Sequence, residues 1–138
     1  MAAQRTLGII KPDGVEQKKI GEILTMIEEA GLDVLGLKMI RLSRPQAETF
    51  YQVHRSRPFY GELVEFMTRG PVVVMCLEGE DAVDRWRKLM GATDPAKAED
   101  GTIRKRFGSN VGENAVHGSD APETAQFEVS YFFPGAEL

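Results

Sequence analysis

Glu128 carries a charge where the sequence pattern favours an apolar side chain. On a helix it would share one stripe with residues at offsets of four, seven and eleven positions from Ala121. That stripe consists of Ala121, Ala125, Glu128 and Phe132. A carboxylate that faces a protein interior needs a hydrogen-bond donor or a cation as its partner. The possible partners are a backbone donor, an arginine or a histidine, and the segment before the helix offers His117 and Ser119.

Arg87 is a second charge on an apolar stripe. It falls four residues after Val83, on the inner side of the helix that its neighbours predict. The common explanation is an arginine at the edge of the stripe whose charged group extends into solvent. The alternative is a cation held near a ligand, and that choice needs further signals from the sequence.

The composition excludes several kinds of site. With 138 residues, 42% of them hydrophobic and 28% charged, the chain is expected to form a single domain over residues 1–138. The formal net charge of -4 argues against broad binding of nucleic acid or anionic membranes, so a polyanionic ligand must meet a local basic cluster. Cys76 makes no intrachain disulfide, and two histidines, His54 and His117, provide no zinc-ligand spacing. The apolar run 7–10 is too short for a secretion signal, so we expect a cytoplasmic protein.

Local patterns in the first third of the chain predict the elements that position these residues. A strand over residues 6–10 must end at Pro12, which places Lys11 at the strand end. A one-faced helix follows, and Gly31 is expected to end it in the left-handed conformation. Residues 33–42 suit a second strand.

The middle of the chain predicts two helices and a buried strand. Ser43 and Gln46 have the spacing of a capping box at the start of a short helix. A second helix is expected between Pro58 and Gly70. The run 72–77 is apolar without alternation, which favours a central strand covered on both faces.

The last part of the chain is less regular. A helix that Asp81 caps and Gly91 ends is followed by residues 92–113, which show no sustained period and predict a long loop of the kind that is usually functional or disordered. Residues 115–117 suit a short strand, and Asp120 with Glu123 has capping-box spacing for a final helix. Strands and helices thus mix along the chain, which favours one sheet with helices packed on it.

The segment Asn114-x-x-His117-Gly118-Ser119-Asp120 resembles the active-site signature of nucleoside diphosphate kinases. Five further motifs resemble family motifs in the same order and extend over nearly the whole chain. They are Lys11-Pro12-Asp13-Gly14, Arg57-Pro58-Phe59, Gly70-Pro71-Val72, Met90-Gly91-Ala92-Thr93-Asp94-Pro95 and Gly101-Thr102-Ile103-Arg104. Because six ordered matches leave little room for coincidence, the chain is identified as a member of that family.

The resemblance implies both a fold and a reaction. The fold is a ferredoxin-like α/β (α+β) sandwich with a four-stranded antiparallel sheet covered by helices. The reaction moves the γ-phosphoryl group of a nucleoside triphosphate, typically ATP, to a nucleoside diphosphate by a ping-pong mechanism through His117. A neutral imidazole can attack phosphorus near pH 7 and release the group again. Glu128 would orient the imidazole, and Ser119 would support the Glu128 carboxylate, with Gly118 beside them.

The resemblance also assigns the residues that bind phosphate. Lys11, Arg87 and Arg104 match the family positions that neutralise the phosphates, which gives Arg87 a function. Thr93 would donate a hydrogen bond to phosphate, and Tyr51 would lie near the phosphates and His117. From the pattern alone, Tyr51 would be placed in the core.

The remaining assignments concern the nucleoside and the metal. Phe59 would stack on the base, and Val111 and Leu63 would close an apolar slot around it. Because stacking tolerates any base, the site is expected to accept different bases. Leu63 is equally well explained as a core residue of its helix. Lys11 and Asn114 would bond the sugar hydroxyls. Mg²⁺ should bridge the phosphates with little direct protein ligation, so no metal ligand is predicted.

Two features depart from the family pattern. Where the family usually has an acidic residue two positions after the loop arginine, this chain has Arg106. The loop or a subunit contact then lacks an acidic partner, or the extra charge aids phosphate capture. The chain also ends soon after Phe132-Phe133-Pro134, without the longer C-terminal tail of many relatives. The expected assembly is a homo-oligomer, either a tetramer or a hexamer.

Two other classes of function fit the same fold. A catalytically silent nucleotide-binding module is disfavoured because His117, Lys11 and Glu128 are all present. An RNA-binding domain is disfavoured because the chain is acidic and lacks an aromatic-rich strand motif. We therefore expect nucleotides as partners, and neither nucleic acid nor membranes.

Overall fold

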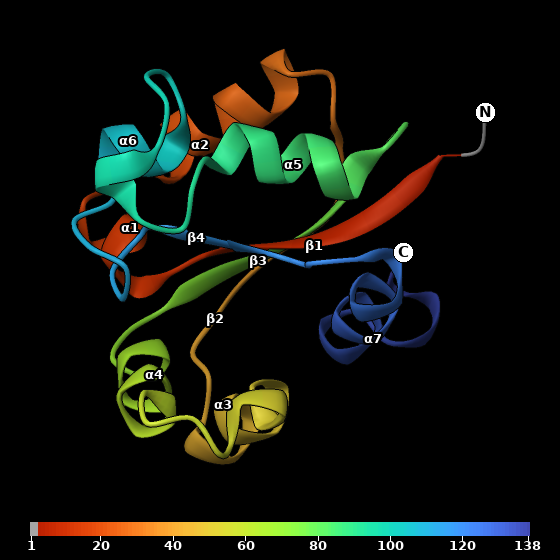
Figure 1. Ribbon diagram of the computed structural model, residues 1–138. Helices are drawn as coiled ribbons and strands as arrows, with labels where there is room; N and C mark the ends of the chain where they lie inside the picture. Colours follow the sequence, from red (N-terminus) through yellow and green to blue (C-terminus); the bar gives the residue numbers. More distant parts are fainter. Residues whose placement is uncertain (1–2) are drawn as a thin grey trace.

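The computed structural model describes residues 3–138 and contains a four-stranded antiparallel sheet. Its strands are β1 (Gln4–Ile10), β2 (Asp33–Ile40), β3 (Val72–Gly79) and β4 (Val116–Gly118), in the order β2-β3-β1-β4. Helices cover both faces of the sheet (Figure 1). The ferredoxin-like sandwich expected from the resemblance is confirmed.

The helices divide between the two faces of the sheet. The α-helices are α1 (Pro12–Glu16), α2 (Ile20–Glu29), α3 (Arg44–Phe50), α4 (Tyr60–Met67), α5 (Ala82–Met90), α6 (Ile103–Phe107) and α7 (Pro122–Phe132), and the short 3-10 helices are η1 (Gln52–His54), η2 (Pro95–Lys97) and η3 (Gly135–Glu137). Helices α2, α5 and α6 lie on one face, and α3, α4 and α7 lie on the other (Figure 1). None of the helices in residues 3–138 has the length and apolar character needed to cross a membrane.

Strand β3 contributes side chains to two apolar cores. Its alternate side chains point to opposite faces, Val72, Val74 and Cys76 to one core and Val73, Met75 and Leu77 to the other. All six are buried, so the prediction of a central strand covered on both faces is confirmed. The neighbouring strand β1 is central as well, and its pairing with β4 places Ile9 opposite His117.

Several helix ends follow the local sequence. The Ser43 side chain accepts a hydrogen bond from the Gln46 backbone N–H at 3.2 Å, and the Gln46 side chain accepts one from the Ser43 N–H at 2.9 Å, so the capping box is confirmed. Gly31 (φ 86°) and Gly91 (φ 90°) both adopt the positive φ that glycine tolerates, as predicted.

Two predicted caps are wrong. Asp81 has φ 52° and its side chain makes no cap; instead the Gln4 side chain accepts from the Val83 N–H at 2.9 Å. Asp120 does not cap the last helix, because its carboxylate pairs with a cation on α5. Helix α7 begins at Pro122, and the Thr124 hydroxyl accepts from the Ala121 N–H at 3.0 Å.

Several short helices were not predicted, among them α1, η2 and α6. Pro12 begins α1 directly after β1, because proline suits the first turn of a helix as well as a turn. The expected loop over residues 92–113 contains η2 and α6, the latter capped by the Thr102 side chain, which accepts from the Lys105 N–H at 3.3 Å. A five-residue helix is too short to show periodicity.

Candidate active site

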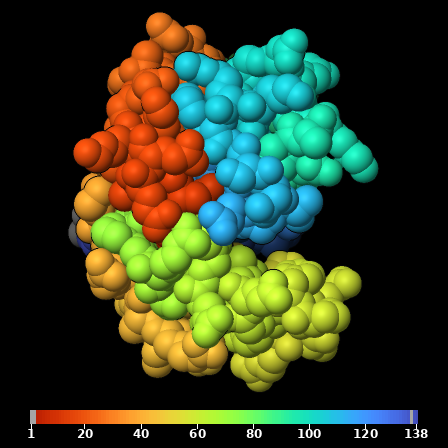
Figure 2. Space-filling view, turned by 90° about the vertical axis from the view of Figure 1, so that its left-hand side faces the viewer, coloured from red at the N-terminus to blue at the C-terminus, as the bar shows by residue number. Residues whose placement is uncertain are grey.

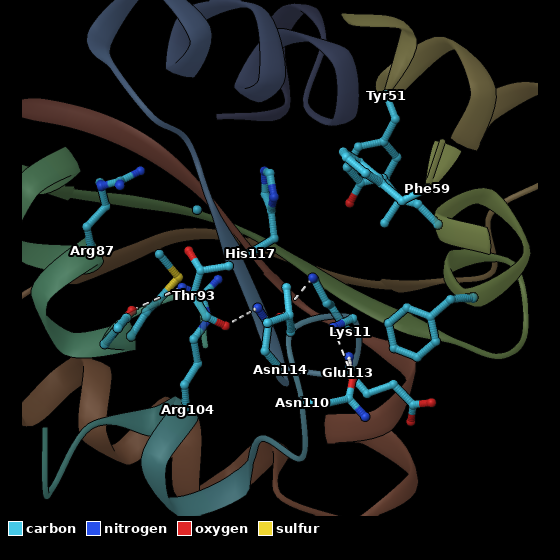
Figure 3. A pocket seen from close by; sticks show the side chains of 18 of the residues that line it. Lys11, Tyr51, Phe59, Arg87, Thr93, Arg104, Asn110, Glu113, Asn114 and His117 are labelled. Atoms are coloured by element: carbon cyan, nitrogen blue, oxygen red, sulfur yellow. Dashed lines mark hydrogen bonds between the residues drawn. The ribbon is translucent and has the colours of Figure 1, made fainter. Parts of the chain in front are cut away.

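A single open pocket gathers most of the predicted site residues. It is lined by Lys11, Tyr51, Phe59, Leu63, Arg87, Thr93, Arg104, Val111, Asn114, His117 and Gly118. Figure 2 shows the molecule notched between the yellow-green segment around η1 and α4 and the cyan segment that follows α5. In Figure 3 the His117 ring stands between Arg87 on one side and Tyr51 and Phe59 on the other.

The imidazole of His117 is held from behind by a carboxylate. Its Nε2 atom lies 2.9 Å from Oε1 of Glu128, and the Ser119 hydroxyl donates to the same oxygen at 2.8 Å. Because an ionised carboxylate only accepts hydrogen bonds, the tautomer with the proton on Nε2 suits this contact and would leave the lone pair on Nδ1. The inward carboxylate predicted from the stripe on α7 thus meets both partners that the sequence offered.

Gly118 lets β4 approach helix α5. A Cβ atom at this position would lie 2.5 Å from Cε of Met90 and 2.6 Å from Cδ1 of Trp86. The Trp86 indole N–H donates to the carbonyl oxygen of His117 at 3.2 Å. The glycine of the motif therefore allows the close packing that fixes the backbone of the histidine.

Lys11 is buried at the end of β1 and paired with Asn114. Its ammonium donates to Oδ1 of Asn114 at 2.9 Å, and the Asn114 amide donates to the Thr93 carbonyl at 3.0 Å. Burial and then the charge of Arg104 lower the pKa of Lys11 to about 8, although the charge of Asp13 acts in the opposite direction. The protein thus holds a cation in an unfavourable place, which an anionic ligand would relieve.

Arg104 and Arg87 approach the pocket in different ways. Arg104 is buried, and its guanidinium donates to the carbonyls of Gly91 at 3.0 Å and Val116 at 2.9 Å. Burial, and then the charge of Arg87, lower the pKa of Arg104 to about 10. Arg87 is half-exposed, and its Nη1 lies 2.7 Å from Oδ1 of Asp120. With Lys11, these side chains give the pocket the local basic cluster that an acidic protein needs for a polyanionic ligand.

Tyr51 belongs to the core and also lines the pocket. Its ring packs edge-on against Phe50 at 4.8 Å and against His117 at 6.1 Å between centroids. Its hydroxyl is buried and has no hydrogen-bond partner among residues 3–138. Burial, with the charge of Glu128, raises the pKa of Tyr51, so the hydroxyl remains a donor.

The apolar slot has one wall on α4 and one on the loop before β4. Phe59 is 47% exposed and Val111 is 56% exposed, although both side chains are apolar. Leu63 lines the pocket and also packs against the core, so its position is compatible with both explanations of this residue.

Two features of the site were missed by sequence reasoning. Asp13 was assigned only to a turn, yet its carboxylate is buried beside the pocket and accepts from the Ala115 N–H at 3.0 Å. Arg69 bridges Glu16 at 2.7 Å and Glu113 at 3.3 Å, which ties the end of α4 to α1 and to the loop before β4. No pattern in a single sequence indicates such long-range pairs.

Arg106 lies away from the basic cluster of Lys11, Arg87 and Arg104. Its guanidinium pairs with Glu22 of α2 at 3.3 Å and lies 4.7 Å from the ring centroid of Phe107. It is not among the residues that line the pocket. The charge of Arg106 therefore links α6 to α2, and its acidic partner, Glu22, lies on α2.

Known proteins resemble this chain over its whole length. The family model described as nucleoside diphosphate kinase matches residues 4–138. A nucleoside diphosphate kinase of Rhodopseudomonas palustris strain BisA53 is 60% identical over 138 residues, which are 100% of this chain and 99% of that protein. One of Trichlorobacter lovleyi is 60% identical over 135 residues, 98% of each.

Solved structures agree with the sequence comparisons. The nucleoside diphosphate kinase of Aquifex aeolicus has a TM-score of 0.97 and 47% identity and covers 99% of each chain. The halophilic enzyme of Halobacterium salinarum, solved in complex with CDP, has a TM-score of 0.95 and 42% identity over 99% of this chain and 91% of that one.

Proposed function

Because this chain belongs to the nucleoside diphosphate kinase family, we propose that its pocket binds one nucleotide at a time and that His117 carries the phosphoryl group between them. The enzyme transfers the γ-phosphoryl group of a nucleoside triphosphate to a nucleoside diphosphate. The observation that carries the proposal is the His117 ring, held through Nε2 by Glu128 and surrounded by cations in an open pocket.

The transfer takes place in two displacements at phosphorus. In the first, Nδ1 of His117 forms a bond to the γ-phosphorus while the bond to the bridging oxygen breaks, and the diphosphate leaves with that electron pair. In the second, a terminal oxygen of the acceptor diphosphate bonds to the same phosphorus, and the N–P electron pair returns to Nδ1. No net change in bond type results, so the exchange runs in both directions.

The surrounding residues act by charge and position. As the N–P bond forms, the imidazole becomes cationic, and the Glu128 carboxylate at 2.9 Å from Nε2 stabilises that charge. Lys11, Arg87 and Arg104 neutralise the phosphates, and Thr93 and the Tyr51 hydroxyl donate to phosphate oxygens. The unpaired hydroxyl of Tyr51 then finds an acceptor that residues 3–138 do not supply.

The nucleoside is held by stacking and by the lysine–asparagine pair. Phe59, Leu63 and Val111 enclose the base without edge-specific donors, which accounts for acceptance of different bases. Lys11 and Asn114, already joined at 2.9 Å, present a donor pair to the sugar hydroxyls. The relative solved with CDP binds a diphosphate of this class.

Magnesium would reach the site as part of the substrate. Within residues 3–138 no group of three or more His, Cys, Asp or Glu side chains is placed to hold a metal ion. Mg²⁺ keeps most of its waters and is readily held by phosphate oxygens. We therefore propose that the ion arrives on the nucleotide. There it offsets the part of the phosphate charge that Lys11, Arg87 and Arg104 do not neutralise.

The decisive experiment follows the phosphoryl group on the protein. The purified enzyme is incubated briefly with magnesium and ATP, its intact mass is measured, and GDP is then added. We expect one phosphoryl adduct that disappears as GTP forms. His117→Ala should show neither, whereas His54→Ala, a variant of the other histidine, should still take the adduct.

The other outcomes identify the alternatives. Formation of GTP by His117→Ala would replace the covalent mechanism by direct transfer. Nucleotide binding without adduct or GTP in the parent enzyme would make the chain a silent nucleotide-binding module.

Assembly and location are further parts of the proposal. We propose a cytoplasmic homo-oligomer, a tetramer or a hexamer, as expected from the resemblance. Light scattering of the purified protein distinguishes these assemblies from each other and from a monomer.

A further inference from the structure

The backbone just before the nucleophile strand is strained. Ala115 has φ 73°, a value that side-chain-bearing residues rarely adopt, and the Val116 N–H donates to the Asn114 carbonyl at 2.9 Å. A hydrogen bond between residues two apart, around a central residue with positive φ, defines the rare and strained form of the γ-turn. Such strain persists only where surrounding contacts hold it.

This γ-turn joins two parts of the site. Asn114 on one side contacts Lys11 and Thr93, and Val116 on the other side begins β4, which carries His117. In Figure 3, Asn114 and Lys11 lie side by side near His117. A change in the turn would therefore move the sugar-binding amide and the imidazole relative to each other.

The segment 11–13 provides the hydrogen-bond partners of both the backbone N–H and the backbone carbonyl of Ala115. The Lys11 backbone N–H donates to the Ala115 carbonyl at 2.8 Å, and the Ala115 N–H donates to Oδ2 of Asp13 at 3.0 Å. Asp13 is 4% exposed and Ala115 is fully buried. The carboxylate thus accepts from the Ala115 N–H away from solvent, where an unpaired charge is costly.

The function of this carboxylate goes beyond the residues assigned to the reaction so far. Resting on the proposed function of His117, we propose that Asp13 is a positioning residue for phosphoryl transfer. Its carboxylate holds Ala115 in the left-handed conformation, and the γ-turn then fixes Asn114 against Lys11 and His117 against Glu128. Asp13 does not line the pocket, and its carboxylate bonds to the Ala115 N–H and not to the imidazole.

The test first removes the acceptor of the Ala115 N–H and then relieves the backbone strain at Ala115. Asp13→Ala should lower kcat, counted per folded active site, by about 100-fold, because small misplacements of reacting groups have effects of this size. Ala115→Gly adopts positive φ freely, and alone should stay close to the parent. Added to Asp13→Ala, it should restore kcat by about tenfold, which corresponds to the strain of one such residue.

A conservative variant separates the acceptor from the charge. Asp13→Asn keeps a carbonyl oxygen for the Ala115 N–H and should retain kcat within a few-fold of the parent. If Asp13→Asn is as impaired as Asp13→Ala, the charge near Lys11 is what matters and the positioning role is wrong. Should Asp13→Ala not fold, Asp13→Glu takes its place, since it displaces the carboxylate by one methylene and has the same expected outcomes.

A merely structural role gives a different pattern. Asp13→Ala would then lower the melting temperature while the folded fraction kept its kcat, and Ala115→Gly would not restore activity. The folded fraction is counted by the phosphoryl adduct on His117. A parent enzyme that takes no adduct contradicts the proposed function itself, whereas a parent with the adduct but no rescue contradicts only the role of Asp13.

Discussion

The Nε2 atom of His117 lies 2.9 Å from Oε1 of Glu128, so a hydrogen bond to the imidazole joins a strand at the edge of the sheet to the helix α7. The Ser119 hydroxyl, 2.8 Å from the same carboxylate oxygen, restricts its orientation. This pair fixes which ring nitrogen faces the pocket, and it is the first relationship that variants should probe.

Glu128→Gln should slow the transfer without abolishing it. The amide can still accept from Nε2, but it cannot compensate the charge that develops on the imidazole. A hydrogen bond to a charged group contributes about 1.5–3 kcal/mol, which corresponds to about 10- to 150-fold in kcat. Ser119→Ala leaves the carboxylate in place and should have the smaller effect. Rapid-quench measurement of the adduct checks both, and an unchanged rate in Glu128→Gln would exclude the role of its charge.

Lys11 should set the alkaline limb of the pH profile. Burial lowers its pKa to about 8 in the free protein, so kcat/KM should fall as pH rises through about 8 and the ammonium is lost. Lys11→Gln should be less active at every pH and lack this limb. A flat parent profile up to pH 9.5 would contradict the assignment.

The same shift has the opposite sign for stability. The unfolded chain keeps the Lys11 proton up to the ordinary value of 10.5, whereas the folded chain releases it near 8. Between these values the unfolded state binds more protons, so this group makes the free energy of unfolding rise with pH. Urea titrations of the parent and of Lys11→Gln at pH 7.5 and 9.5 measure the difference.

Arg87 should matter for activity and not for stability. Its ion pair with Asp120 is exposed on both sides, so Arg87→Ala should change the free energy of unfolding by about 0.5 kcal/mol or less. Loss of one donor to a developing anionic charge should lower kcat by about 100-fold or more.

Arg85 provides the matched control on the same helix. Its guanidinium donates to the carbonyls of Ala30 at 2.6 Å and Glu80 at 3.0 Å, and it does not line the pocket. Arg85→Ala should lose about 1 kcal/mol of stability and keep its kcat/KM. Equal kcat/KM values for the two variants would remove Arg87 from the site.

Phe59 should affect all bases alike. Stacking on an aromatic ring contributes about 1–3 kcal/mol per base, so Phe59→Ala should raise KM by about 5- to 150-fold for purine and pyrimidine diphosphates. Phe127 on α7 is 44% exposed, close to the 47% of Phe59, and lies outside this pocket. Phe127→Ala should leave KM unchanged, and a loss confined to one base would argue for edge recognition instead of stacking.

Sequence patterns predicted the elements whose signals are local. The apolar run 72–77 specified a doubly covered strand, and Ser43 with Gln46 specified a helix start, because each depends on neighbours within a few positions. Asp120 was misassigned because a carboxylate can cap a helix or pair with a cation, and Arg87, 33 positions away, offers the charge-assisted bond.

The gathering of the site depended on the resemblance to a family. Periodicity alone put Tyr51 in the core and left Arg87 as a surface cation, and the structure places both around the same pocket. The contacts of Asp13 and Arg69 were not predicted because their partners lie 102 and 44 positions away. These partners are Ala115 and Glu113. Pairing over such separations depends on strand order, which the strand and helix pattern did not determine.

The pairing of β1 with β4 has a consequence for the order of folding. Lys11 and Asn114, which meet at the end of these strands, are 103 positions apart, so their contact requires closure of one of the longest loops in the chain. Contacts of large sequence separation form slowly because the entropy of loop closure must be overcome first. A refolding chain should therefore regain the shorter-range pairing of β2 with β3 before it regains turnover, and catalysis should be the last property to return.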